Sequence, residues 1–353
     1  MQFKYIDQLL QKEWENQVRE NPFSGFMQSC FWTKFANLLN WPTFKIGLFD
    51  KNKLIGGAVV TKFTSGKNNY LYIPEGPVLP FEEKKAEEMF HSLIREADKI
   101  ADLKGENLTS HLRIEPKLTN LPSFFNRFQK APINEQPLST LIVDLTLNEE
   151  ELLRQMKPKG RYNIKVAKRH GIEVVSKDLA GGMSDFLEFY QQTVERKRFE
   201  GKDESYFYRL IDACEDPSLA KFFFAKRQNE ILAAALIIFY GNLATFLFGA
   251  SSDKYPETMA PYLLHWEIMR HAKDAGFKKY DFLGVAPDED DESHPWHGFT
   301  VFKKKFGGKQ INYIGAYDFV YNKKLYEDYL RENGEKTSGL PFWFGGRLRT
   351  WFR

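Results

Sequence analysis

One order of elements occurs twice along this sequence, and it constrains the fold more than any other feature. In each copy, strand-like runs joined by short turns precede an apolar-periodic helix, which leads to a further strand. The first copy predicts strands at 43–49, 54–63 and 68–73, a helix at about 81–103 and a strand at 108–114. The second predicts strands at 220–227, 231–240 and 243–250, a helix at 261–276 and a strand at 278–284. The sequence therefore predicts two α/β units of one design.

Turn and cap residues support the second copy. Gly241 and Asn242 form a two-residue hairpin signal, Pro261 stands at the start of the helix, and Gly276 follows its last turn. Two further helices, predicted over 184–199 and 204–214, precede this copy. The element order is that of an acetyltransferase (GNAT)-like α/β (α+β) fold, with mixed sheets flanked by helices. Chance recurrence of a common meander-plus-helix unit is the alternative.

The segment between the copies begins with a strand predicted at 139–145. Asn148 is a candidate N-cap for a helix that opens with three glutamates, and Pro158 should stop or kink that helix. A second helix is predicted at 160–170. We place the domain boundary near Leu145, so the two domains are predicted at 1–145 and 146–309.

Length and composition suit two domains, because 353 residues that are 42% hydrophobic can fill two cores of ordinary size. The net charge is only +3, so any attraction to anions must come from local clusters. Cys30 and Cys214 show no metal-ligand or disulfide spacing. The sequence opens without an apolar signal region, and no run approaches the ~20 apolar residues of a membrane span. We expect a cytoplasmic protein without cofactor or metal.

A basic segment at 157–170 lies at the head of the second half. It contains no acid and six cationic residues, namely Lys157, Lys159, Arg161, Lys165, Lys168 and Arg169. Clustered cations of this kind bind phosphate-rich ligands. The alternative is a solvated helix face, although the acids expected at i,i+4 on such a face are missing.

Several blocks of the sequence resemble one known family. The most specific are LLRQMKPKGRYNIKVAKRHGIEV at 152–174 and FTVFKKKFGG with YIGAYDFVYN within 299–322. Further blocks are SYFYRL, SSDKYPETMAPYLLHWE and YDFLG, with weaker likeness in FMQSCFWTKF and EGPV. The resemblance is to the Fem family, the aminoacyl-tRNA-dependent ligases that build peptidoglycan cross-bridges.

The resemblance implies two GNAT-like domains in tandem, the first completed by a C-terminal segment at about 310–340. The chain looks like the shorter branch of the family, which has no coiled-coil arm. The implied reaction moves an amino acid from aminoacyl-tRNA to the stem-peptide amine of a muropeptide precursor, linked to a nucleotide or a lipid. We expect a monomer.

The resemblance also implies catalytic residues. Lys303, in the family's Phe302-Lys303 motif, would stabilise the oxyanion that develops on the aminoacyl ester. The alternative is that residues 303–305 form a solvated lysine run. Glu115 matches a family acid and would orient or deprotonate the amine. A glutamate that simply ends a strand is the alternative there.

The precursor-binding residues of the family map onto Lys34 behind Trp32, and onto Lys202 with Tyr206. Lys202 stands where the family has an arginine, so bidentate contact with phosphate is lost at that position. Phe302 and Phe248 are expected in the substrate site. Phe246 and Phe248 replace two aromatic hydroxyls of the family, which removes hydrogen bonds to the substrate.

Two further regions carry weaker signals. The acidic run 288–292 with His294 and His297 lies in a predicted loop without helical ligand spacing, so we expect no metal there. The tail at 341–353 mixes aromatic and arginine residues, which suits the inner membrane face or stacked RNA. Burial of the tail against the first domain is the alternative.

Two other functions remain open from the sequence. An acyl-CoA-dependent N-acyltransferase would use the same fold, but the segment before Pro261 is a poor pyrophosphate loop. A noncatalytic RNA-binding or envelope-associated scaffold could retain the fold without the chemistry.

Overall fold

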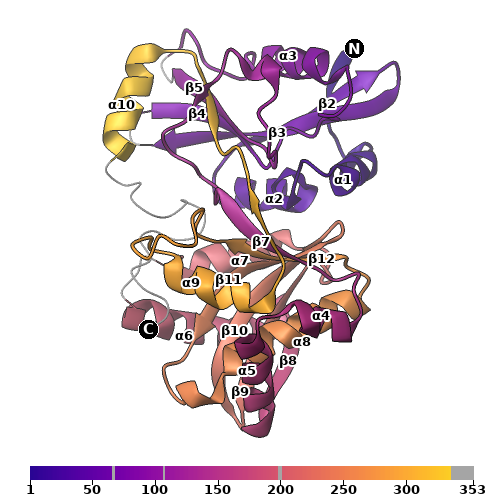
Figure 1. Ribbon diagram of the computed structural model, residues 1–353. Helices are drawn as coiled ribbons and strands as arrows, with labels where there is room; N and C mark the ends of the chain where they lie inside the picture. The colour runs from indigo at the N-terminus through magenta and orange to yellow at the C-terminus, as the bar shows by residue number, and fades with distance from the viewer. Residues whose placement is uncertain (66–67, 106–107, 198–200, 335–353) are drawn as a thin grey trace. The chain divides into compact units, whose positions relative to one another are not determined.

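The computed structural model describes residues 1–65, 68–105, 108–197 and 201–334, which fall into two compact units (Figure 1). Unit 1 contains Met1–Gln136 and the segment that begins at Tyr313, and unit 2 contains Pro137–Asn312. No helix in the described part of the chain has the length and apolar character needed to cross a membrane. The tail at 341–353 lies outside the described residues.

Unit 1 is built on a mixed sheet with the strand order β1-β2-β3-β4-β5-β14-β6. Neighbouring strands are antiparallel except for β4 and β5, which are parallel and are joined by helix α3. The strands are β1 (Gln2–Tyr5), β2 (Thr43–Asp50), β3 (Lys53–Ser65), β4 (Asn68–Pro74), β5 (Thr109–Glu115), β6 (Gln129–Lys130) and β14 (Tyr317–Val320). The helices are α1 (Gln11–Glu20), α2 (Cys30–Leu38), α3 (Ala86–Ala97) and α10 (Lys323–Gly334).

A buried ion pair fixes the returning strand β14 to this sheet. Arg113 on β5 donates to both carboxylate oxygens of Asp318 on β14, each at 2.8 Å, and to Glu135 at 2.9 Å. The Arg113 side chain is fully buried, so the two acids balance a charge that would otherwise be costly to desolvate. A segment distant in sequence thereby completes the first unit.

Unit 2 repeats the design with the strand order β13-β7-β12-β11-β10-β9-β8. Here β11 and β12 are the parallel pair, and helix α8 joins them (Figure 1). The strands are β7 (Ser139–Asp144), β8 (Ile172–Asp178), β9 (Ala220–Arg227), β10 (Glu230–Tyr240), β11 (Leu243–Ser251), β12 (Lys279–Gly284) and β13 (Lys309–Asn312). The helices are α4 (Glu149–Gln155), α5 (Pro158–Arg169), α6 (Leu179–Lys197), α7 (Glu204–Ala213), α8 (Ala260–Asp274) and α9 (His297–Lys303).

Local sequence signals explain several element ends in unit 2. Asn148 accepts a hydrogen bond from the Glu151 backbone amide while the Glu151 side chain binds the Asn148 amide, which forms a capping box. Pro158 occupies the first turn of α5, where its missing amide costs nothing. Gly171 and Gly276 follow α5 and α8 with positive φ angles, as expected of residues that end helices.

Some boundaries differ from the sequence-based expectations. The helix predicted at 81–103 is shorter, because turns occupy the residues before Ala86 and after Ala97. Strand β7, which we placed in the first domain, pairs with β12 and β13, so the first unit ends near Gln136 rather than Leu145. Strand β13 likewise belongs to unit 2, and only the chain from Tyr313 onward returns to unit 1.

Candidate active site

The parallel strands β11 and β12 separate before they end. They are paired at Leu243, Ala244 and Thr245 only, although β11 continues to Ser251 and β12 to Gly284. An extra residue, Leu247, lies in the register between β10 and β11, which bends β11 at this point. The separated ends leave a space in the sheet that the next helix, α9, helps to enclose.

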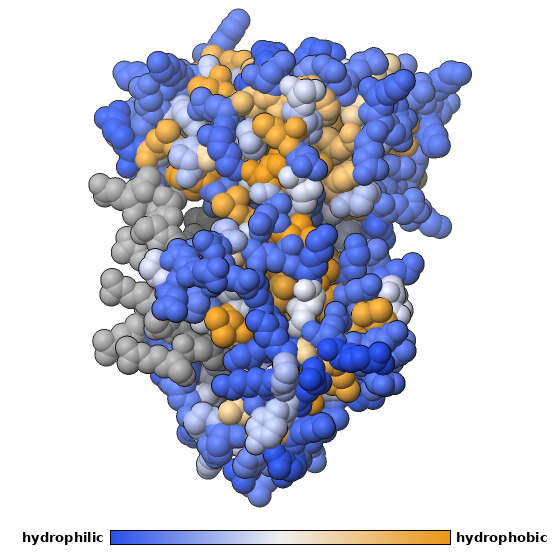
Figure 2. All heavy atoms as spheres, in the orientation of Figure 1, coloured by the Kyte–Doolittle hydropathy of each residue, from blue (hydrophilic) through white to orange (hydrophobic). Residues whose placement is uncertain are grey.

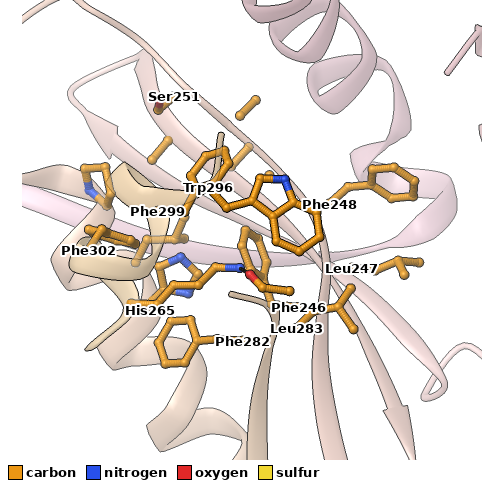
Figure 3. Close-up of a pocket in the computed structure, with 18 of the residues that line it drawn as sticks. Phe246, Leu247, Phe248, Ser251, His265, Phe282, Leu283, Trp296, Phe299 and Phe302 are labelled. Carbon is orange, nitrogen blue, oxygen red and sulfur yellow. Dashed lines mark hydrogen bonds between the residues drawn. The ribbon is translucent and has the colours of Figure 1, made fainter. Parts of the chain in front are cut away.

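A pocket occupies this space (Figure 3). The space between its walls is about 940 Å³, open solvent included. Most of the wall is apolar and aromatic, and the polar lining side chains are Tyr190, Ser251, His265, Trp296 and Lys303. A wall of this kind strengthens the electrostatic effect of the few polar groups within it.

Lys303 presents its ammonium to this pocket from the end of α9. Its Nζ donates to the carbonyl oxygen of Gly284 at 2.7 Å and lies 5.7 Å from the ring centre of Phe246 and 5.9 Å from that of Phe299. Only 8% of the residue is exposed. Burial lowers the pKa of Lys303 to about 7, and the charge of Asp281 opposes this shift. The lysine is therefore not part of a solvated run.

The carboxylate of Asp281 shapes the strand end that holds Lys303. Between Asp281 and Gly284, β12 carries an extra residue relative to β7, and Leu283 has a left-handed φ of 58°. Asp281 accepts hydrogen bonds from the Leu283 backbone amide, at 2.7 Å, and from the Thr140 hydroxyl. The acid thus stabilises a bulge that turns the Gly284 carbonyl toward Lys303.

His265 lines the same pocket but is held neutral. Its Nδ1 is hydrogen-bonded to the Tyr280 hydroxyl at 2.8 Å, and its ring packs on Phe246 with centroids 4.7 Å apart. Burial, with the nearby charge of Lys303, lowers the pKa of His265 to about 3. An imidazole in this setting is a poor proton shuttle near pH 7.

Two other residues proposed from the sequence lie at the pocket wall. Phe302 and Phe248 both line it, and Phe302 packs on Tyr262 with ring centroids 5.0 Å apart. Tyr206 contacts Phe248, with centroids at 5.9 Å, and Lys202 lies 5.4 Å above the Tyr206 ring. The Lys202 position therefore connects to the pocket through aromatic contacts.

The basic segment forms most of α5, whose cationic side chains are largely exposed. Arg161 is the exception, because its guanidinium donates to the Leu153 and Met156 carbonyls at the end of α4. Lys168 lies 3.8 Å from Glu267 on α8, so an acid distant in sequence partly balances the run. The second unit is largely hydrophilic on the face drawn in Figure 2.

The start of α5 packs beside the lysine run that contains Lys303. The Lys157 amide donates to the Lys305 carbonyl at 3.1 Å. A side chain at Gly160 would meet that same carbonyl at 2.4 Å, so glycine permits the close approach. The contact ties the basic helix to the turn that follows α9.

Glu115 belongs to unit 1, at the end of β5. Its carboxylate accepts hydrogen bonds from the Tyr72 hydroxyl at 2.7 Å and from the amides of Glu135 and Gln136. Burial raises the pKa of Glu115 to about 8, and the bonds from Tyr72 and Gln136 oppose the rise. Glu115 is thus a buried acid whose carboxylate is held by three hydrogen bonds at the end of β5.

Trp32 and Lys34 also lie in unit 1, on helix α2. The Ser29 hydroxyl caps this helix by accepting from the Trp32 amide at 3.1 Å. Trp32 is buried against Phe26 and Phe35, with ring centroids at 5.5 and 5.2 Å, whereas Lys34 is exposed. The two neighbours therefore differ: one packs the core and one faces solvent.

The acidic loop contains no metal-ligand arrangement. Within the described ranges, no group of three or more His, Cys, Asp or Glu side chains is placed to hold a metal ion. His294 instead accepts a hydrogen bond from the Trp296 amide at 3.0 Å, which shapes the turn before α9. This bond helps to position the start of α9.

The turn before α8 is a poor cradle for a pyrophosphate. The amides of Thr258, Met259 and Tyr262 already donate to carbonyls of the same turn, and Pro261 has no amide. An acyl-CoA site would need several free amides at this helix start. The local backbone therefore disfavours the coenzyme A alternative.

Sequence patterns missed His265 and Trp296, which line the pocket, and Asp281, which holds the bulge beside it. Asp281 did carry a signal, since an acid between apolar residues of a predicted strand indicates a buried carboxylate. Trp296 stood in a predicted loop and carried no signal of its role.

Comparison with known proteins identifies the family of this chain. Residues 9–120, 99–227 and 218–330 match the model of the FemAB family. The chain belongs to the FemAB family. It is 24% identical to a "Lipid II:glycine glycyltransferase" of Staphylococcus aureus (strain MRSA252), with 88% of this chain and 91% of that protein covered.

Solved structures show the same fold. The crystal structure of FemX matches with a TM-score of 0.79 at 21% identity, and 93% of this chain and 99% of that one are covered. A tandem GNAT protein from the clavulanic acid biosynthesis pathway matches with a TM-score of 0.51 at 8% identity, covering 91% and 99%. The prediction of two GNAT-like units in tandem is confirmed.

Proposed function

We propose that this FemAB-family protein transfers an amino acid from aminoacyl-tRNA to the stem-peptide amine of a peptidoglycan precursor. The similarity to a lipid II:glycine glycyltransferase over 88% of the chain supports acyl transfer to such a precursor. The pocket of unit 2 supports the chemistry, because it buries a lysine where an acyl group can enter. The acceptor carries either a nucleotide or a lipid.

The buried ammonium of Lys303 is the observation that carries this proposal. The acceptor nitrogen forms a bond to the ester carbonyl carbon, and negative charge develops on the carbonyl oxygen. The C–O bond to the ribose then breaks, and the proton lost by the amine passes to the ribose oxygen. A cation fixed in an apolar pocket stabilises the intermediate oxyanion without prior reorganisation.

Lys303 can play this role only while it is protonated, and with a pKa of about 7 it is mostly protonated below that pH. The rest of the reaction requires positioning, since an aminoacyl ester is already activated. In this proposal Glu115 orients or deprotonates the amine. Lys34 binds the precursor from helix α2, and the buried Trp32 holds that helix in place. Phe302 and Phe248 contact the substrate at the pocket wall.

Phosphate recognition is proposed at two places. Lys202 and Tyr206 contact the precursor, and the exposed cations of α5 bind tRNA or precursor phosphate. The α5 cations proposed for this contact are Lys157, Lys159, Lys165, Lys168 and Arg169, with Arg161 fixing the helix start. We propose a cytoplasmic monomer whose tail at 341–353 meets the inner membrane face.

The test is a transfer assay with radiolabelled aminoacyl-tRNAs and both nucleotide-linked and lipid-linked muropeptides. Lys303→Met should lower kcat about 10²- to 10³-fold, the usual loss for an oxyanion donor. Lys304→Met is the matched control, because Lys304 pairs with Glu289 outside the pocket and should keep wild-type turnover. No product with any charged tRNA, under conditions in which a known family member works, would refute the function.

A parallel measurement addresses the alternatives. A ligand that binds the folded state raises the melting temperature. We expect coenzyme A not to bind, so it should leave the melting temperature of this protein unchanged. If the protein is a scaffold, cells with the Lys303→Met variant should behave like the wild type. If it is an enzyme, they should behave like cells that lack the protein.

A further inference from the structure

The indole of Trp296 carries a hydrogen-bond donor that the described part of the chain leaves without a partner. Among the residues that the structure describes, Nε1 of Trp296 is buried and has no hydrogen-bond partner. The residue is only 9% exposed and lines the pocket that contains Lys303. A buried donor without a partner costs free energy, so its persistence in a pocket points to a partner that arrives with the ligand.

The position of this ring is fixed by its backbone and by a glycine. The Trp296 carbonyl accepts from both the amide and the hydroxyl of Thr300, each at 2.9 Å, at the start of α9. A side chain at Gly284 would meet the six-membered part of the indole at 2.9 Å, so the ring packs directly on this glycine. The donor is therefore held in place before any ligand binds.

Gly284 links the indole to the catalytic lysine. Its carbonyl accepts from Lys303 Nζ, while its Cα faces the benzene edge of Trp296, far from Nε1. Figure 3 shows the indole nitrogen on the side of the ring away from His265 and Phe282. The pocket wall thus contains two residues that carry donors, the cationic Lys303 and Trp296 with its neutral N–H.

We propose that Trp296 Nε1 donates a hydrogen bond to a carbonyl oxygen of the substrate other than the one that becomes the oxyanion. This proposal rests on the proposed function and names a specificity-determining residue of the same site. An indole N–H can only donate, so it selects for an acceptor such as an ester, amide or peptide oxygen. Two substrates offer such oxygens, the aminoacyl end of the tRNA and the stem peptide of the precursor.

A kinetic test separates these two sources. Trp296→Phe removes the donor but keeps an aromatic ring, and it should lower kcat/KM about tenfold. The change should appear in the KM of one substrate only, which identifies the source of the oxygen. Trp266→Phe is the matched control, since Trp266 is a buried tryptophan of the core of unit 2 that does not line the pocket.

A binding test is independent of turnover. In ¹⁵N-labelled protein, the indole resonance that is lost in Trp296→Phe should move downfield when a hydrolysis-resistant aminoacyl-adenosine or a soluble muropeptide is added. A shift with one ligand supports the proposal even if no transfer assay has succeeded. An unmoved resonance at saturation with both ligands, or equal kinetics for Trp296→Phe and wild type, would overturn it.

Discussion

The two units share one topology but treat their parallel strand pair differently. In unit 1, β4 and β5 stay paired from Asn69 with Thr109 to Pro74 with Glu115, and the irregularity in their register comes near the start. In unit 2, β11 and β12 pair only up to Thr245 with Asp281. The parallel strands therefore stay paired to their ends in unit 1, whereas in unit 2 they separate and leave an opening.

The difference has a local cause. In unit 2, Leu247 is an extra residue in β11, and the left-handed Leu283 ends the regular course of β12. Each irregularity turns backbone groups out of the ladder, and the buried carboxylate of Asp281 satisfies the Leu283 amide. A pocket at this position thus depends on a few backbone irregularities, with no change of topology.

The largest effect is expected from breaking the charge network that closes unit 1. Arg113→Met leaves Asp318 and Glu135 buried without their cation, which should cost about 3–5 kcal/mol of unfolding free energy. The measurement is urea unfolding. Arg127→Met is the control, because Arg127 is exposed above the Phe319 ring and should cost under about 1 kcal/mol. Equal losses would show that the network is not what holds β14.

The buried Lys303 in the pocket of unit 2 should make the free energy of unfolding depend on pH. Lys303 has a folded-state pKa of about 7 against an ordinary value of 10.5, so the unfolded chain binds more protons between these pH values. Wild-type stability should therefore rise with pH in this window relative to Lys303→Met, by at most about 1.4 kcal/mol per unit. Urea unfolding at pH 6 to 10 measures the difference. A constant difference would contradict the buried ammonium.

Repetition of local patterns made much of the fold predictable from the sequence. Strands such as β9, predicted at 220–227, and the cap at Asn148 follow from alternation and capping rules that act over a few residues. The short strands β13 and β14 were missed, because four residues carry little periodic signal. Their place in a sheet depends on partners far away in sequence, such as Arg113 for Asp318.

The candidate site was predictable only in part. Lys303, Phe302 and Phe248 were expected from the resemblance, and the structure brings them to one pocket. The pairing of Trp296 with Gly284 could not be predicted, since it depends on the shape of a loop.

A smaller effect is expected from the residue that supports the bulge of unit 2. Asp281→Asn removes a charge that raises the pKa of Lys303, so the pKa should fall below 7. If protonated Lys303 is required, kcat falls as pH rises through this pKa, and the variant should lose activity at a lower pH than wild type. The pH profile of kcat measures this. Loss of the ionic hydrogen bonds should also cost about 1–2 kcal/mol of stability.

The smallest effect is expected where unit 1 joins its parallel strands. Tyr72 on β4 donates to Glu115 on β5, so Tyr72→Phe should cost about 1 kcal/mol, measured by urea unfolding. The hydroxyl lowers the pKa of Glu115, and its removal should raise that pKa above its present value of about 8. The loss should therefore be greater at pH 9, where the wild-type carboxylate is ionised, than at pH 6. A loss that does not change with pH would mean that the hydroxyl does not stabilise the charge of Glu115.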